Sequence, residues 1–244
     1  MLSSIVDGSI DSIVIPNDIT IIGYCAFNGC TNLVSVIIPD TITRIKASAF
    51  RVCPLTSNIY IPNSVTSIES WAFFGCKMTT FDMPDSVNSI GTNLFANCTS
   101  LKSFFISNAL TSITEATFSE CTDLTTVRTR GSTSVTSIGK NAFYNCKKLQ
   151  FIDTHLVTSI GEAAFYNCEK LISIDTNSLV TIGNNAFYNC KLLGNLILPS
   201  SVTSIGANAF YGCTSMTKIT IRKPANSISG SPWGFTGGII SWTG

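Results

Sequence analysis

The sequence predicts a solenoid in which short parallel strands stack along one axis, and three observations indicate it. The tract Asn-Ala-Phe-Tyr-Asn-Cys occurs at 141–146 and 185–190, and a copy that begins with Ala occurs at 163–168. The phenylalanine of this tract recurs at intervals of 22–25 residues, a period typical of solenoids with one strand per coil. Each of these phenylalanines follows an Ile by five residues and precedes a Cys by three. The repeat phenylalanines are Phe27, Phe50, Phe73, Phe95, Phe118, Phe143, Phe165, Phe187 and Phe210.

One short strand per coil is predicted between the Cys and the next Ile. The stretch Val36-Ile37-Ile38 represents this segment, and its pattern indicates a strand whose first and third side chains point inward. Proline follows directly in several coils, as at Pro39, where its missing N–H does not weaken the strand ladder. We therefore expect about ten parallel strands at a spacing of ~4.8 Å. They are centred on the outward residues Val14, Ile37, Tyr60, Asp82, Phe105, Arg128, Asp153, Asp175, Ile197 and Thr220.

A helical or 3₁₀ turn is predicted on the opposite side of each coil, because the Ala-Phe tract is too short for a free helix. The position two residues after the phenylalanine is Gly or Asn in seven of the nine coils, which predicts a positive φ there. A lone coil cannot bury its Ile, Phe and Cys, so stacking must bury them as continuous columns. We expect the solenoid, with a minimal N-terminal cap, over residues 1–221 and a C-terminal capping segment over 222–244.

Composition excludes several classes of partner. The 244 residues carry 15 Lys+Arg and 14 Asp+Glu, whereas nucleic-acid binding needs a basic excess that neutralises phosphates. Mean hydropathy is +0.34, yet no uninterrupted apolar run exceeds four residues. A helix that spans a membrane needs about 20 such residues. We therefore expect no nucleic-acid partner and no insertion into a membrane.

The repeat resembles the BspA-type leucine-rich repeat family. The family pattern, Leu-x-x-Ile-x-Ile-Pro-x-x-Val-x-x-Ile-Gly-x-x-Ala-Phe-x-x-Cys, can be read from Leu193 through Cys213 with almost no mismatch. The unit Leu33–Cys53 also fits, with Lys46 in place of the Gly. The resemblance implies a leucine-rich-repeat solenoid, a right-handed curved α/β-type superhelix, with its sheet on the concave face and its helical turns on the convex face. It also implies a non-enzymatic role in adhesion or binding at the surfaces of bacteria and protozoa, with extracellular matrix or host proteins as partners.

The cysteines and the single histidine are the candidate reactive groups. Nine of the ten cysteines share one repeat position, where parallel Cβ vectors disfavour complete pairing into disulfides. No second close pair or His joins Cys25 and Cys30 in a metal site. We expect a column of buried free thiols that act as small hydrophobes, with sporadic bridges between neighbouring coils as the alternative. His155 lies near Asp153 without any nucleophile motif, so we expect a surface histidine, no catalytic residue, no metal and no cofactor.

The outward row of strand centres is the candidate binding surface. The structural columns keep one residue type, whereas this row mixes aromatic, acidic and basic residues, and aromatic and Arg side chains are frequent anchors of protein interfaces. We expect Tyr60, Phe105 and Arg128 as anchors, with Asp153 and Asp175 setting specificity through charge. An unselected solvent face, or an ion pair between Arg128 and Asp153, is the alternative. The full predicted set is Tyr60, Asp82, Phe105, Arg128, Asp153 and Asp175, with Arg130, His155 and Asn177 as rim residues in coils that lack the Pro.

The predicted function is a non-enzymatic module that binds a protein or other macromolecule on its concave face. The alternative is an intracellular scaffold with the same fold and no adhesive role. The start MLSSIVDGSI lacks the basic and apolar regions of a secretory signal, and a free-thiol column fits a reducing compartment. These observations favour the cytoplasm, whereas the family resemblance implies the cell surface, so both compartments stay open. The oligomeric state is not determined by these residues.

Overall fold

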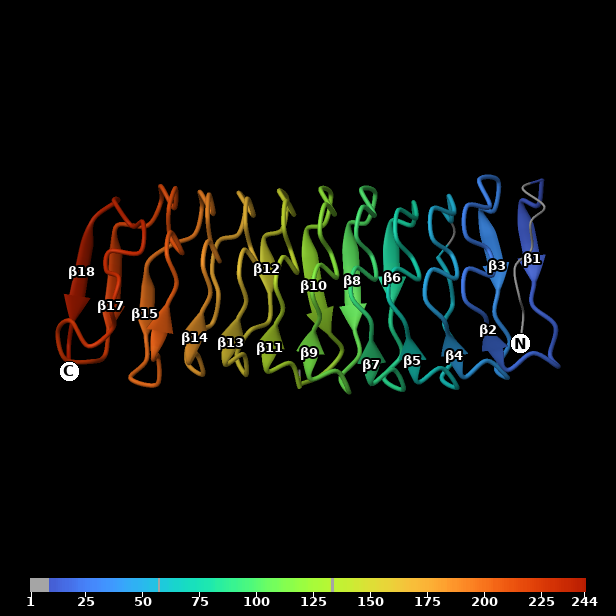
Figure 1. Cartoon of the computed structure of the whole chain (residues 1–244), viewed down its shortest axis with the longest axis horizontal. Coiled ribbons are helices and arrows are strands. Elements are labelled where there is room, and N and C mark those ends of the chain that lie inside the picture. The colour runs from blue at the N-terminus through green and yellow to red at the C-terminus, as the bar shows by residue number, and fades with distance from the viewer. Residues whose placement is uncertain (1–8, 57, 133) are drawn as a thin grey trace.

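The computed structural model describes residues 9–56, 58–132 and 134–244, which form one row of stacked coils (Figure 1). Two lines of short parallel strands run along the row. The parallel solenoid predicted from the repeat period is therefore confirmed. The described residues contain no helix, so the helical turns predicted for the side opposite the strands are wrong.

The first line of strands contains the segments predicted from the alternating pattern. Eight of the ten predicted segments hold a strand, and each pairing advances by one coil, as where Phe105 lies opposite both Asp82 and Arg128. The segments around Tyr60 and Asp175 hold no strand, which divides the line into three sheets. The strands are β1 (Ser12–Val14), β3 (Ser35–Ile37), β6 (Thr80–Asp82), β8 (Ser103–Ile106), β10 (Thr126–Thr129), β12 (Phe151–Ile152), β15 (Leu196–Leu198), β17 (Lys218–Ile221) and β18 (Ile239–Trp242). Their outward side chains, together with those of the two unpaired segments, form the surface that we call the strand face.

The second line consists of two-residue strands that end at the repeat Ile. The sequence pattern does not predict it, because two residues are too few to show an alternation. Threonine hydroxyls reinforce this line, as where Thr158 Oγ1 donates to the Thr136 carbonyl at 3.1 Å. The strands are β2 (Ile21–Ile22), β4 (Arg44–Ile45), β5 (Ser67–Ile68), β7 (Ser89–Ile90), β9 (Ser112–Ile113), β11 (Ser137–Ile138), β13 (Ser159–Ile160), β14 (Thr181–Ile182) and β16 (Ser204–Ile205).

The side of each coil that holds the repeat phenylalanine, here called the turn side, forms overlapping tight turns. In residues 25–30, the even-numbered N–H groups donate to carbonyls three residues back, at 3.1–3.3 Å. The odd-numbered N–H groups donate to carbonyls of the next coil, at 2.8–3.0 Å. A 3₁₀ helix needs the first kind of bond at consecutive residues. Because every second N–H bonds along the solenoid axis instead, this segment cannot be helical.

Left-handed backbone occurs at two positions of each turn. The predicted position, two residues after the phenylalanine, has a positive φ in all nine coils, including those where Val52 and Glu120 replace Gly or Asn. The second position lies two residues before the phenylalanine, and the sequence does not reveal it because its residues share no chemical type. These residues are Cys25, Ser48, Trp71, Asn93, Ala116, Asn141, Ala163, Asn185 and Asn208.

The interior consists of the columns predicted from the repeat. The nine phenylalanine rings are buried and stack with centroids 5.1–5.8 Å apart, at interplanar angles of 1–13°. Such offset aromatic stacks add to the free energy gained by burying the rings. The column therefore forms one continuous core along the whole molecule.

The cysteine column is hydrogen-bonded as well as buried. All ten cysteines are free, and eight thiols donate to the carbonyl of the phenylalanine one coil earlier, at 2.9–3.2 Å. Cys168 Sγ, for example, donates to the Phe143 carbonyl, which also accepts the N–H of Cys146. The thiols are therefore hydrogen-bond donors between coils, a role that their expected behaviour as small hydrophobes does not include.

Residues 222–244, the predicted capping segment, pack onto the last coil. Strand β18 pairs in parallel with β17, and the N–H of Phe210 donates to the Trp233 carbonyl at 3.1 Å. Trp233 and Phe235 are buried. The segment thus continues both the strand ladder and the aromatic core beyond the last repeat.

Substitution of Gly183 by alanine is expected to lower the free energy of unfolding by about 1–3 kcal/mol or more. A Cβ at this position would lie 2.5 Å from the Glu162 nitrogen and 2.6 Å from the Gly161 carbonyl carbon, and main chain cannot move aside as a side chain can. The control is Gly194→Ala, whose new Cβ would meet only the Ile172 oxygen at 3.7 Å. Chemical denaturation of both variants measures the difference, and equal stabilities would contradict the close coil contact.

Candidate functional site

The strand face brings the predicted binding residues onto one surface. Asp82, Phe105 and Arg128 occupy neighbouring strands in direct register, and all three are exposed. Tyr60 is 66% exposed on the unpaired segment before them. Asp153 and Asp175 are half-buried further along the same row. The placement agrees with the sequence pattern, and the role of these residues in binding stays a prediction.

Arg130, predicted as a rim residue, instead lies across the strand face. It comes from two coils after Asp82, yet its guanidinium forms an ion pair with that carboxylate and donates to the Met83 carbonyl at 3.3 Å. The guanidinium carbon also lies 5.8 Å from the centre of the Phe105 ring, within the range of a cation–π contact. In the part of the chain that the structure describes, Arg128 forms no ion pair, so the alternative pairing with Asp153 is not formed.

A first hollow on the strand face, the Tyr60 hollow, has a volume of about 960 Å³. It opens where residues 59–61 depart from strand geometry. Its lining includes Asn58, Tyr60, Asp82, Asp85, Phe105 and Arg130. Two of the predicted anchors, Tyr60 and Phe105, therefore border a single recess.

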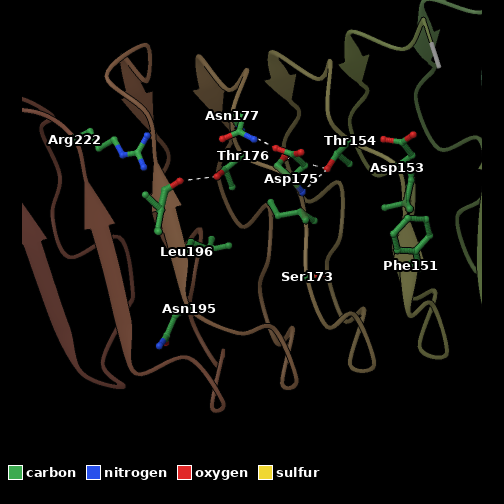
Figure 2. Close-up of a pocket in the computed structure, with 13 residues that line it drawn as sticks. Phe151, Asp153, Thr154, Ser173, Asp175, Thr176, Asn177, Asn195, Leu196 and Arg222 are labelled. Carbon is green, nitrogen blue, oxygen red and sulfur yellow. Dashed lines mark hydrogen bonds between the residues drawn. The ribbon is translucent and has the colours of Figure 1, made fainter. Parts of the chain in front are cut away.

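A second hollow, the Asp175 hollow, has a volume of about 620 Å³ and is shown in Figure 2. It contains predicted residues, Asp153, Asp175 and Asn177, together with residues that the sequence reasoning missed. The missed residues are Phe151, Ser173, Asn195 and Arg222. The first three lie two residues before the central outward row, so the alternation of side chains along a strand places them on the same face. That alternation is the signal that could have found them.

Two buried threonines line the Asp175 hollow. Thr154 and Thr176 are buried at inward positions that most other coils fill with an aliphatic side chain. Thr154 Oγ1 accepts the Asp175 N–H at 2.8 Å and donates to the Asp175 carbonyl at 3.0 Å, as Figure 2 shows. Thr176 Oγ1 donates to the Ile197 carbonyl at 2.5 Å. Side-chain bonds thus replace the main-chain ladder, which explains why residues 174–176 form no strand.

The two carboxylates of this hollow are oriented by the residues that replace proline. Asp175 Oδ1 accepts the N–H of Asn177 at 2.9 Å, and Asp153 Oδ1 accepts the N–H of His155 at 3.2 Å. A proline at either position would have no N–H to donate. His155 Nδ1 also lies 2.7 Å from Asp153 Oδ1, so this histidine is a partner of Asp153 at the edge of the hollow. The Oδ2 atom of each carboxylate makes no hydrogen bond to any residue that the structure describes.

The turn side carries an aromatic ladder in the last repeats. Tyr144, Tyr166, Tyr188 and Tyr211 stack with centroids 4.6–4.9 Å apart. Beside them, the amide of Asn167 donates to Asn145 at 2.8 Å. Because the rings face one another, each presents mainly its edge to solvent.

The described residues were also compared with the requirements of a metal site and of a membrane-spanning helix. They contain no group of three or more His, Cys, Asp or Glu side chains placed to hold a metal ion. They also contain no helix that is long and apolar enough to cross a membrane.

Comparison with known families gives one match that covers most of the chain. The model of the BspA type leucine rich repeat region matches residues 6–59, 44–171 and 136–237, with six copies. Proteins built from such repeats are typically binding modules and not enzymes. A comparison with curated protein sequences found no significant match.

Several solved structures are similar to this chain. A leucine-rich repeat protein from Bacteroides ovatus is 24% identical, with 96% of this chain and 84% of that chain covered and a TM-score of 0.42. A leucine rich cell surface protein from Faecalibacterium prausnitzii is 27% identical, with coverage of 91% and 80% and a TM-score of 0.47. The leucine rich repeat protein of T. pallidum is 22% identical, with coverage of 75% and 78% and a TM-score of 0.52. The structure of the T. pallidum protein supports the solenoid fold of this chain.

Proposed function

Because the chain belongs to the BspA-type leucine-rich repeat family, we propose that it is a non-enzymatic module that binds a protein partner on its strand face. The observation that carries the proposal is the gathering of Tyr60, Phe105 and Arg128 on one exposed surface. The few residues that dominate the binding energy of protein interfaces are enriched in Trp, Tyr and Arg. The six predicted residues come from six strand positions at ~4.8 Å spacing, a span of roughly 25 Å that suits part of a standard interface.

Two settings for this activity follow from different observations. The family resemblance supports adhesion at the cell surface, with an extracellular matrix or host protein as the partner. The column of free, buried thiols supports an intracellular scaffold, since thiols persist in reducing compartments. Labelling of surface proteins on intact cells distinguishes the two settings, because only an adhesin is labelled without lysis.

A triple variant tests the strand face. Tyr60→Ala, Phe105→Ala and Arg128→Ala together are expected to reduce partner capture at least tenfold, since each truncation of an anchor typically costs more than about 1 kcal/mol of binding energy. The measurement is a pull-down with the intact chain on cell extracts and on matrix proteins, quantified by mass spectrometry. Tyr211→Ala on the turn side is the control and should retain the partner. If the triple variant folds normally and captures the same partner equally well, the strand face is not the binding surface.

A further inference from the structure

The strand face already shows how it holds a guanidinium group. The Arg130 guanidinium meets three kinds of partner at once: the Phe105 ring at 5.8 Å, the Asp82 carboxylate and the Met83 main-chain carbonyl. An aromatic face, a carboxylate and a carbonyl match the chemistry of this group, which is planar, positively charged and rich in N–H donors. Arg130 therefore shows, at the border of the Tyr60 hollow, which groups of the strand face can hold a guanidinium.

The Asp175 hollow presents the same three kinds of group with no guanidinium between them. The Phe151 ring is 47% exposed at its border. Asp153 and Asp175 each keep one carboxylate oxygen that bonds to none of the described residues, while Oδ1 is fixed by the local turn. Ile174 also lines the hollow, and its main-chain carbonyl accepts no hydrogen bond from the described residues.

Charge in the hollow is not balanced by its own cations. Arg222 is the one lysine or arginine among the lining residues, and it forms no ion pair within the described chain. Figure 2 shows Arg222 at the end of the hollow opposite Phe151 and Asp153. No lysine or arginine side chain of the described residues therefore pairs with the carboxylates of Asp153 and Asp175. His155 contacts Asp153 at the edge of the hollow.

We propose that the Asp175 hollow binds an arginine side chain of the protein partner, which rests on the proposed function of the strand face. The guanidinium stacks on Phe151, pairs with the free oxygens of Asp153 and Asp175, and donates to the Ile174 carbonyl. Arginine fits better than lysine because its planar fork can stack on a ring and bond two acceptors at once, whereas an ammonium is a compact, strongly hydrated charge. The partner thus presents a basic residue at this point of the face.

Binding of short peptides tests the hollow without a known partner. The probes are acetylated Gly-Arg-Gly amide, the same peptide with lysine, and the same peptide with citrulline, which keeps the shape of arginine without its charge. Binding to the ¹⁵N-labelled full chain is followed by NMR. We expect the arginine peptide to shift the amide signals of Ser173 and Asp175. The lysine peptide should bind at least threefold more weakly than the arginine peptide, and the citrulline peptide at least tenfold more weakly.

The variant Asp153→Asn/Asp175→Asn removes both charges but keeps Oδ1 as the acceptor that each turn needs. It should bind the arginine peptide at least tenfold more weakly than the unmodified chain, and Phe151→Ala at least threefold more weakly. Asp18→Asn/Asp40→Asn, which removes two exposed charges elsewhere, is the matched control and should bind normally. Absence of binding to the unmodified chain, equal binding of the lysine or citrulline peptide, or equal binding by the double variant would overturn the proposal.

The test of the arginine site can fail or succeed independently of the test of partner binding on the strand face. The triple variant Tyr60→Ala/Phe105→Ala/Arg128→Ala leaves the Asp175 hollow intact and should still bind the arginine peptide. If it does so while partner capture is unchanged, the anchors of the wider proposal are wrong and the arginine site remains. If the peptide fails to bind the unmodified chain while partner capture depends on the anchors, the arginine site alone is wrong.

Discussion

Raising the pH from about 8 to about 10 is expected to remove most of the free energy of unfolding of this solenoid. Burial raises the pKa of eight thiols of the cysteine column, and that of Cys53, Cys98 and Cys213 reaches about 12. Well below pH 9 the thiols are protonated in both the folded and the unfolded state. Above it, thiols of the unfolded chain lose protons that the folded chain retains, so stability falls as the pH rises toward the folded pKa.

The size of the effect follows from the number of thiols. One pH unit above the unfolded pKa, each thiol that stays protonated in the folded chain costs about 1 kcal/mol, and eight together cost on the order of 10 kcal/mol. A typical domain has a free energy of unfolding of about 5–15 kcal/mol. Urea denaturation with reductant at a series of pH values measures the slope. Cys168→Ala removes one of the eight titrating groups and should reduce the loss of stability between about pH 8 and 10 by about 1 kcal/mol. Constant stability between about pH 8 and 10 would show that the column is not buried in its protonated form.

Substitution of Phe165 by alanine is expected to lower the free energy of unfolding by about 3–5 kcal/mol. The ring is fully buried and stacks on Phe143 at 5.2 Å and on Phe187 at 5.3 Å, so its removal leaves a cavity between two rigid neighbours. Chemical denaturation measures the loss.

Two controls accompany the Phe165 variant. Phe151→Ala removes the same atoms from a ring that is half in water and should cost less than about 1.5 kcal/mol. Lys148→Ala breaks an exposed ion pair with Asp123 and should change stability by no more than about 0.5 kcal/mol. A Phe165 variant no less stable than these controls would place the phenylalanine column outside the core.

The fold could be predicted from the sequence because each buried column keeps one residue type in almost every coil. An inward Phe, Ile or Cys can stack only on its equivalents, so the period alone dictates parallel coils. The direction of the main-chain hydrogen bonds, by contrast, cannot be read from residue types. Nothing in the Ala-Phe tract shows that every second N–H bonds to the next coil, which is why a helical turn was the wrong expectation. The two-residue strands, such as β13, are likewise invisible to an argument from alternation.

The candidate site was predictable in part. The alternation of strand residues places Tyr60, Phe105 and Arg128 on one face without further information. The position of the Arg130 guanidinium was not predictable, because a long side chain can reach any of several coils. The repeated Ile-Asp-Thr sequences at 152–154 and 174–176 were visible. Their effect depends on whether a threonine hydroxyl displaces a main-chain bond, and residue type alone does not decide that.

The direction of the hydrogen bonds also determines how the molecule responds to force. Strands β1 and β18 lie at opposite ends of the row, and the bonds between coils run along the line that joins them (Figure 1). Tension between the ends is therefore expected to load the successive interfaces between coils one after another, in the direction of their hydrogen bonds. Each coil released would add roughly 75 Å of extended chain. We therefore expect the protein under load to lengthen in steps of one coil.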